Sequence, residues 1–462
     1  RLARKLHAPA VPRRPIEATG VAGGPMGFAQ ARLWLVEQVG AGQGTYHVPR
    51  VWRLRGPLDR ERLEASVQQL VDRHDVLRAR FVLRDGEPWM DVVDDVPVEL
   101  PVGPGGWADV HEEIRRPFDL ETGPAFRARL IRLDVDDHLL VLTLHHLVCD
   151  GPSLDLIERE LSAGWSGRRL PDLPVTFADH ARWQRDALDG PHALDLVAFW
   201  QRQLADLAPV LALPTDRARP SSPSYQGTRV VRSHPAAALR ALGGPQATLH
   251  MVVVAGLAAA LARWSGDTDI AIASPIANRD TPEVDDLIGF FVDTVVVRTS
   301  LDGNPSVDEL LRRVRTSILD AHQHAGLPFE RLVDELAPPR KPSQQPFTQV
   351  MCVFQPARPN GLELDGLDVE LAPVSTGTAK YDLTLHVEDH GDRLELALIG
   401  ASDLFDPATL ELLAEELCAV LTDLPAEGMR LDDLGGAEAD EDVLDAALLA
   451  IIDQHDRGTS RG

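Results

Sequence analysis

Residues 144–153, with the sequence LHHLVCDGPS, carry the strongest local signal of chemistry in the chain. His145 and His146 end a strongly apolar run, and Asp150 and Gly151 follow where the chain must turn. Because successive side chains of a strand point to opposite faces, one histidine can face a cleft while the other packs inward. Asp150 can hold the turn through a salt bridge, and Gly151 allows a substrate to approach the backbone closely. This layout favours one histidine that serves acyl transfer.

Other interpretations of the same segment are weaker but stay open. The histidine pair is either purely structural or, with Asp150, a metal site; yet adjacent histidines on opposite faces cannot easily bind one ion, and HExxH spacing is missing. Cys149 is a conceivable nucleophile, although a small buried side chain is the simpler explanation. The sequence has no GxSxG, no GxGxxG after a strand and no Walker loop, so neither a serine nucleophile nor a nucleotide site has support.

Length and composition indicate a large, acidic, globular chain. Its 462 residues exceed what one hydrophobic core usually supports, which predicts two domains or lobes. The 46 basic and 71 acidic side chains give a net charge of −25, which disfavours nucleic acid as a partner. Three scattered cysteines form no CxxC pair, which fits a reducing cytoplasm. The longest apolar run, 251–262, is about half the length a bilayer needs, so no membrane partner is expected.

Hydrophobic periodicity predicts helices and strands in both halves of the chain, and therefore an α/β fold or α+β layers. Helical patterns cover residues 27–38, 59–81, 248–264 and 306–322, and Asp59 is the expected N-cap of the second of these. Strand patterns cover residues 126–133, 138–148, 268–277 and 347–355, and 380–400 is a hairpin that turns at Asp389–Asp392.

Changes in composition along the chain predict five segments. They are a tail or linker at 1–24, an N-terminal lobe at 25–206, a crossover at 207–227, a C-terminal lobe at 228–435 and an acidic helix with a tail at 436–462. The crossover is proline-rich and has no apolar period, which is typical of a connection between lobes. The apolar stripe of the last segment docks on its own domain, or forms a helix for docking or dimerisation.

The segment HHLVCDG resembles the HHxxxDG motif of the condensation domains of nonribosomal peptide synthetases. Further segments resemble other motifs of that family and follow its order across roughly residues 26–420. They are GFAQARLWLVEQV (27–39), RHDVLRARF (73–81), FADHARWQ (177–184), IGFFVDTVVVR (288–298), HAGLPFERLV (324–333), RKPSQQPFTQVMCVFQ (340–355), KYDLTLHV and SDLFD (402–406).

This resemblance implies a pair of chloramphenicol-acetyltransferase-like lobes in a V shape, with an active-site tunnel between them. It also implies that an aminoacyl or peptidyl group arrives on the phosphopantetheine arm of a carrier protein. The acceptor is then a small molecule or a second carrier-bound group, with an amine or an alcohol as the nucleophile. Neither a metal nor a bound cofactor is expected, because the thioester is already activated.

The resemblance also implies roles for individual residues. His146 would orient the attacking amine and take its proton, and Gly151 would place a backbone N–H near the reacting carbonyl. His145 and Asp150 would be structural, with Asp150 paired to an arginine. The candidates for that arginine are Arg279 and, as second choice, Arg298.

Two departures from the family pattern bear on the acceptor. Pro152 stands where the family usually has a large aromatic residue, and Asp293 replaces the usual asparagine. Together with Ser153 they are expected at the acceptor channel. Within the family, an epimerisation domain and a non-catalytic recruitment domain are the alternatives, and retention of both histidines argues against recruitment alone. The chain is either a free-standing enzyme, which the acidic C-terminal segment slightly favours, or a part of a larger synthetase.

Overall fold

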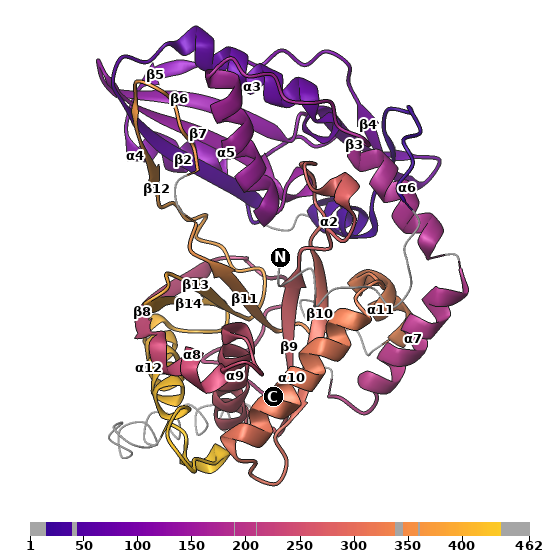
Figure 1. Cartoon of the computed structure of the whole chain (residues 1–462), viewed down its shortest axis with the longest axis vertical. Coiled ribbons are helices and arrows are strands. Elements are labelled where there is room, and N and C mark those ends of the chain that lie inside the picture. Colours follow the sequence, from indigo (N-terminus) through magenta and orange to yellow (C-terminus); the bar gives the residue numbers. More distant parts are fainter. Residues whose placement is uncertain are drawn as a thin grey trace. The chain divides into compact units, whose positions relative to one another are not determined.

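The computed structural model describes residues 15–38, 44–188, 190–208, 210–337, 345–358 and 361–435. Within them the chain forms two compact units. The first unit runs up to Asp195 and also includes Ala277–Asp293 and Arg358–Thr376. The second unit comprises Leu196–Ile276, Thr294–Ala357 and the chain from Gly377 onward. Both units mix helices with sheets, so the predicted α/β class is confirmed (Figure 1).

The first unit is built on a five-stranded sheet of order β12-β2-β7-β6-β5. These strands are β12 (Asp368–Ala372), β2 (His47–Arg55), β7 (Asp137–His145), β6 (Phe126–Asp134) and β5 (Val102–Pro104). A smaller sheet of order β1-β4-β3 consists of Gly24–Pro25, Glu87–Val92 and Ala79–Arg84. Its helices are α2 (Phe28–Gln38), α3 (Arg60–Arg73), α4 (Trp107–Arg115), α5 (Gly151–Trp165) and α6 (Phe177–Ala187).

Strand β7 is apolar along its length because helices cover both faces of its sheet. Its residues Leu139 and Val141 belong to one apolar cluster with Val110 and Ile114 of α4. The intervening Leu140, Leu142 and Leu144 belong to the main core of the unit, which also holds buried residues of α3 and α5. Sheet and helices thus hold the end of β7, where the histidines lie, in a close-packed frame.

The second unit is built on a six-stranded sheet of order β10-β9-β11-β13-β14-β8. These strands are β10 (Asp293–Ser300), β9 (Asp269–Ile276), β11 (Val350–Pro356), β13 (Leu383–Asp389), β14 (Arg393–Ala401) and β8 (Gly227–Pro235). Its helices are α7 (Pro191–Gln203), which begins in the first unit, α8 (Ala237–Gly243), α9 (Leu249–Ser265), α10 (Val307–Gln323), α11 (Phe329–Leu336) and α12 (Pro407–Asp423). The predicted hairpin is confirmed as β13–β14.

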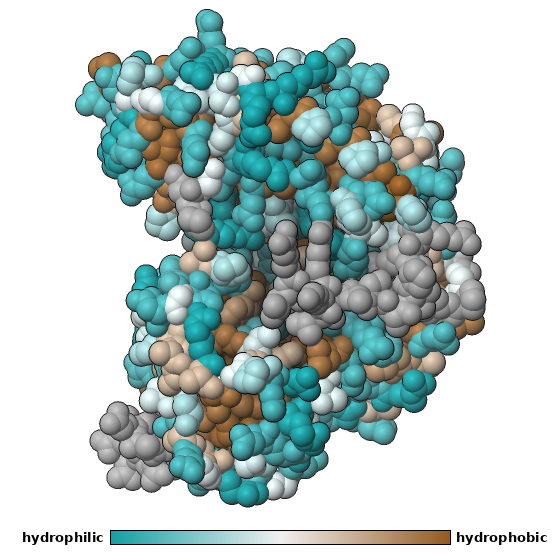
Figure 2. Space-filling model, viewed as in Figure 1, coloured by the Kyte–Doolittle hydropathy of each residue, from teal (hydrophilic) through white to brown (hydrophobic). Residues whose placement is uncertain are grey.

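Helix α9 is buried almost all round, which explains its apolar sequence. Thr248 caps its N-terminus, and Gly266 ends it with a φ of 73°. None of the helices within the described ranges is long and apolar enough to cross a membrane. The face of the protein shown in Figure 2 is mostly hydrophilic, in keeping with the acidic composition.

The expected domain boundaries are wrong where segments distant in sequence pack together. Residues 277–293 and 358–376 were expected in the C-terminal lobe, but they belong to the first unit. The cause is specific pairing, since β12 pairs with β2 in antiparallel register and forms the edge of the sheet. The chain leaves the first unit at Asp195, before the expected crossover.

The proline-rich segment 207–227 packs within the second unit, so it is not the crossover between units. The backbone N–H of Asp216 donates to the carbonyl of Leu404, and Arg219 forms an ion pair with Asp382. Its prolines therefore mark irregular structure on the surface of one unit.

Residues 15–24 of the expected tail are also part of the first unit. Ile16 is buried, the hydroxyl of Thr19 lies 2.6 Å from Asp179 Oδ1, and Gly24 pairs with Met90. The expected acidic helix at 436–462 lies outside the described residues.

Candidate active site

The two histidines occupy different environments at the end of β7. The strand ends at His145, and residues 146–148 form the 3-10 turn η2, so the strand predicted over 138–148 is three residues too long. His145 is 1% exposed. Its Nδ1 accepts from the backbone N–H of Leu147 at 3.2 Å, which leaves Nε2 as the protonated nitrogen, 3.4 Å from Glu37 Oε1. The buried His145 side chain therefore stabilises the turn through these two contacts.

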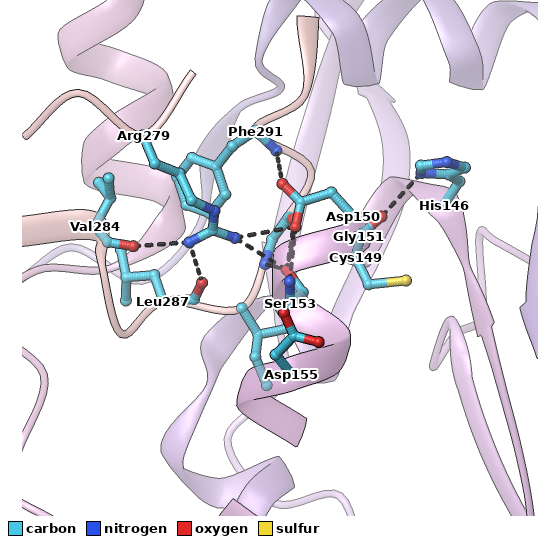
Figure 3. Close-up of polar contacts among 12 residues, drawn as sticks. His146, Cys149, Asp150, Gly151, Ser153, Asp155, Arg279, Val284, Leu287 and Phe291 are labelled. Atoms are coloured by element: carbon cyan, nitrogen blue, oxygen red, sulfur yellow. Dashed lines mark hydrogen bonds and ion pairs between the residues drawn. The ribbon is translucent and has the colours of Figure 1, made fainter. Parts of the chain in front are cut away.

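His146 is half-buried and has a defined tautomer. Its Nδ1 lies 2.9 Å from the carbonyl oxygen of Cys149 (Figure 3). A carbonyl oxygen can only accept, so Nδ1 carries a hydrogen, and in the neutral imidazole the lone pair is therefore on Nε2. The backbone N–H of His146 donates to the carbonyl of Tyr46 at 2.8 Å. The ring of Phe290 lies beside the imidazole, with 4.9 Å between ring centroids.

Helix α2 clamps the histidine turn through two side chains. The buried Gln30 donates from Nε2 to the carbonyl of Leu147 at 2.7 Å, and its Oε1 accepts from the backbone N–H of Gly27. Glu37 lies about two helical turns further along the same helix and contacts His145. The sequence pattern over residues 27–38 predicts this helix but assigns no role to either side chain, although the two lie on the same helical face.

Asp150 is the N-cap of α5 and is completely buried by its partners. Its Oδ1 accepts from Ser153 N at 2.9 Å and from Arg279 at 3.0 Å, and its Oδ2 accepts from Phe291 N at 3.2 Å (Figure 3). The first-choice partner, Arg279, is therefore the one that forms the ion pair. The second choice, Arg298, pairs with Asp269 of the second unit at 2.6 Å.

Arg279 connects α5 to the following loop of the first unit. Its guanidinium donates to the carbonyls of Val284 and Leu287, both at 2.8 Å, and stacks on the ring of Phe291 at 4.1 Å. One buried cation thus fixes the active-site helix and the loop 282–291 together.

Ser153 does not line a channel, contrary to the sequence expectation. Its side chain is fully buried, with Oγ 2.6 Å from Asp150 Oδ1. Gly289 N donates to the same hydroxyl at 3.1 Å. Serine at this position completes the packing of α5 against the loop because its small hydroxyl satisfies buried polar groups.

Gly289 leaves no space for a side chain. A Cβ there would lie 2.2 Å from Cδ2 of the buried Phe177 and 2.8 Å from Phe291. We therefore expect Gly289→Ala to lower the free energy of unfolding by about 3 kcal/mol, because the packed rings cannot move aside. Urea denaturation measures the effect, and Gly103→Ala, which meets nothing within 4 Å, is the matched control. Equal stability of the two variants would show that the loop can shift to accommodate the added methyl group.

Gly151 begins α5, so its backbone N–H lies at the positive end of a 15-residue helix. Its carbonyl accepts from Arg358 at 2.6 Å, and Arg358 also lies 3.2 Å from Asp155. Pro152, in the first turn, is half-buried and suits that position because its missing N–H needs no partner there. Sequence reasoning missed Arg358, since 207 residues separate it from Gly151.

Residues 361–365 run along the second half of α5. Contacts recur at each turn of the helix, from Gly361 N to Glu158, from Glu363 N to Ser162 Oγ and from Trp165 Nε1 to the carbonyl of Asp365. These bonds hold the helix that carries Asp150 and Gly151 against its own unit.

Asp293 is the first residue of β10 and is 7% exposed. Cys149 is buried. Among the residues that the structure describes, no three histidine, cysteine, aspartate or glutamate side chains are grouped so that they could hold a metal ion.

The family model named Condensation domain matches residues 24–430 of this chain. Among curated proteins, a linear gramicidin synthase of Brevibacillus parabrevis is 38% identical over 416 residues, covering 84% of this chain and 5% of that protein. Phosphinothricin tripeptide synthetase PhsC of Streptomyces viridochromogenes is 37% identical over 442 residues, covering 91% of this chain and 40% of that protein. The chain thus spans a small part of these synthetases.

Solved structures agree with this assignment. The X-domain from teicoplanin biosynthesis, in complex with OxyB, is 30% identical with a TM-score of 0.84, covering 92% of this chain and 98% of the X-domain. The four-domain nonribosomal peptide synthetase AB3403 shares the fold at 18% identity and a TM-score of 0.84, covering 94% of this chain and 35% of AB3403. The resemblance seen in the sequence is confirmed: the chain belongs to the condensation domain family of nonribosomal peptide synthetases.

Proposed function

We propose that this domain transfers an aminoacyl or peptidyl group from a carrier-protein phosphopantetheine thioester to an amine or an alcohol, forming an amide or an ester. The observation that carries the proposal is the hydrogen bond from His146 Nδ1 to the carbonyl of Cys149, which leaves the lone pair of the neutral imidazole on Nε2. A neutral imidazole fixed in this way suits a base that accepts a proton from an attacking nucleophile.

In this proposal the acceptor nucleophile adds to the thioester carbonyl carbon while its proton moves to Nε2 of His146. Negative charge develops on the carbonyl oxygen. The backbone N–H of Gly151, at the start of α5 and five residues after His146, is proposed to donate to this oxygen and stabilise the charge. The tetrahedral intermediate then expels the phosphopantetheine thiolate, which takes the proton from His146. The products are the amide or ester and the free thiol, and the histidine returns to its starting form.

The chemistry requires neither a metal nor a cofactor held by the chain, because the thioester is already activated. The roles of Asp150 and Arg279 are structural in this scheme, since the guanidinium of Arg279 donates to the Asp150 carboxylate, to the Ser153 hydroxyl and to two loop carbonyls, all in the first unit. Pro152 and Asp293 are proposed to lie along the path of the acceptor. The carrier protein is the proposed partner, and the acceptor is either soluble or bound to a second carrier.

Intact-mass spectrometry of an aminoacyl-loaded carrier protein tests the proposal directly. The wild-type chain, mixed with this donor and a panel of amines and alcohols, is expected to remove the acyl mass from the carrier and release a product of matching mass. A reaction without the chain controls for spontaneous aminolysis. In heavy water, deuterium incorporated into the donor without transfer would instead indicate an epimerisation domain.

The similarity to an X-domain solved in complex with OxyB supports a second candidate, recruitment of a partner enzyme. Binding of purified OxyB, measured by calorimetry, tests it with a defined probe. Tight binding together with no transfer to any acceptor would favour recruitment over catalysis.

A further inference from the structure

The loop 287–291 of the first unit is anchored at every residue but one. Leu287 is held through its carbonyl by Arg279, and the N–H of Ile288 donates to Nδ1 of His74 at 3.3 Å. The anchors of Gly289 and Phe291 are the side chains of Ser153 and Asp150. Phe290 stands between these fixed points.

The anchor on Ile288 is itself rigid. His74 is 1% exposed, and because its Nδ1 accepts from Ile288, its Nε2–H donates to Glu160 of α5 at 2.9 Å. Arg73 adds a second bond to the same carboxylate group at 3.2 Å. The loop therefore shares one buried polar network with α3 and α5.

Phe290 differs from its neighbours in where its side chain lies. Leu287, Ile288 and Phe291 are each no more than 2% exposed and belong to the core of the first unit. Phe290 is only half-buried, and its ring lies against the imidazole of His146 at a centroid distance of 4.9 Å and an interplanar angle of 59°. A large apolar ring is thus held beside the proposed base.

We propose that Phe290 determines the size of the acceptor, by limiting the substituent on the carbon that bears the attacking nitrogen or oxygen. The inference rests on the proposed function. A nucleophile that gives its proton to Nε2 must come within about 3 Å of that nitrogen. Its carbon then lies beside the same imidazole that Phe290 flanks, so a bulky substituent meets the phenyl ring.

The ring cannot be displaced by movement of the loop. Gly289 is closely surrounded, since a Cβ there would lie 2.2 Å from Phe177, and Phe291 is fixed to Asp150 through its backbone. A side chain on such a rigid segment selects acceptors by size, because an acceptor cannot displace the segment without breaking buried hydrogen bonds. Acceptors with a small substituent, such as a glycyl or alanyl group, are the preferred class.

Kinetics with carrier-bound glycyl, alanyl, leucyl and phenylalanyl acceptors test the inference. We expect Phe290→Ala to raise the kcat/KM ratio of the phenylalanyl to the glycyl acceptor by about tenfold or more, with Phe290→Leu in between. Phe28→Ala removes another half-buried phenylalanine of the first unit, whose ring lies under the guanidinium of Arg185, and should leave the ratio unchanged. Thermal unfolding of each variant verifies that the fold is retained, and Phe290→Leu serves if Phe290→Ala fails to fold.

The two proposals fail in different ways. If the wild-type chain transfers to these acceptors and the Phe290 variants keep the wild-type ratio, the size limit lies elsewhere and only this inference is overturned. If the wild-type chain transfers to no acceptor, the proposed function is overturned and the inference falls with it.

Discussion

Replacement of His146 by alanine is expected to lower the rate of acyl transfer by a factor of about 10² to 10⁴, the range that a positioned general base contributes. The variant lacks the imidazole that takes the proton from the attacking nucleophile. The carbonyl of Cys149 also loses its donor. That second loss costs stability by about 1 kcal/mol, so the variant should fold.

Two further variants separate the base from its surroundings. His146→Gln keeps an amide that can donate to the Cys149 carbonyl but lacks a basic nitrogen, so it should be as inactive as the alanine variant. His138→Gln alters a buried histidine at the opposite end of the same strand and should retain wild-type activity. Single-turnover transfer, followed by the mass of the loaded carrier, measures all three. Wild-type rates in both His146 variants would falsify the assignment of the base.

Replacement of Asp150 by alanine is expected to lower the free energy of unfolding of the first unit by about 3–5 kcal/mol. The guanidinium of Arg279 would stay buried without its carboxylate, and the N–H groups of Ser153 and Phe291 would lose their acceptor. Transfer should fall as well, because the cap that sets the start of α5 is lost.

A double variant isolates the contribution of the ion pair. Asp150→Ala combined with Arg279→Met removes both charges, and it should recover part of the lost stability because no uncompensated charge remains. Asp155→Ala, on the same helix but with a side chain that is 57% exposed, should change the free energy of unfolding by less than about 1 kcal/mol. Guanidinium denaturation measures the free energy of unfolding of all three variants. Equal stability of the Asp150 and Asp155 variants would contradict the structural role.

Local sequence patterns predicted local structure well because each depends on neighbouring residues. Asp59 caps α3 as expected, accepting from Arg62 N at 3.0 Å, and the pattern over 248–264 matches α9, Leu249–Ser265. Strand alternation predicts one histidine inward and one toward a cleft; in the structure His145 is buried at the end of β7, and His146 is half-buried in the 3-10 turn that follows. Both histidines lie where an apolar strand ends, and the end of such a strand is visible in the local hydrophobic pattern.

What the sequence could not decide depends on pairs of residues far apart in the chain. Arg279 and Arg298 were both reasonable partners for Asp150, and only the course of residues 277–293 places the first of them there. Ser153 was expected at a channel, but its burial depends on Gly289, 136 residues further along. The division into units failed for the same reason, since no local pattern marks a segment that returns to an earlier sheet.

Because residues 277–293 and 358–376 belong to the first unit, the order of synthesis affects how that unit folds. The first unit cannot be completed from the first 195 residues, because its edge strand β12 and its loop 277–293 are synthesised later. On the ribosome, the second unit's first segments therefore emerge while the first unit still lacks the counter-ion of Asp150. At roughly 5–20 residues per second, the 84 residues from Asp195 to Arg279 take about 4 to 17 seconds. The half of the chain that is translated first is thus the half whose folding must wait for the later one, and its unfinished sheet edge is exposed to aggregation in the meantime.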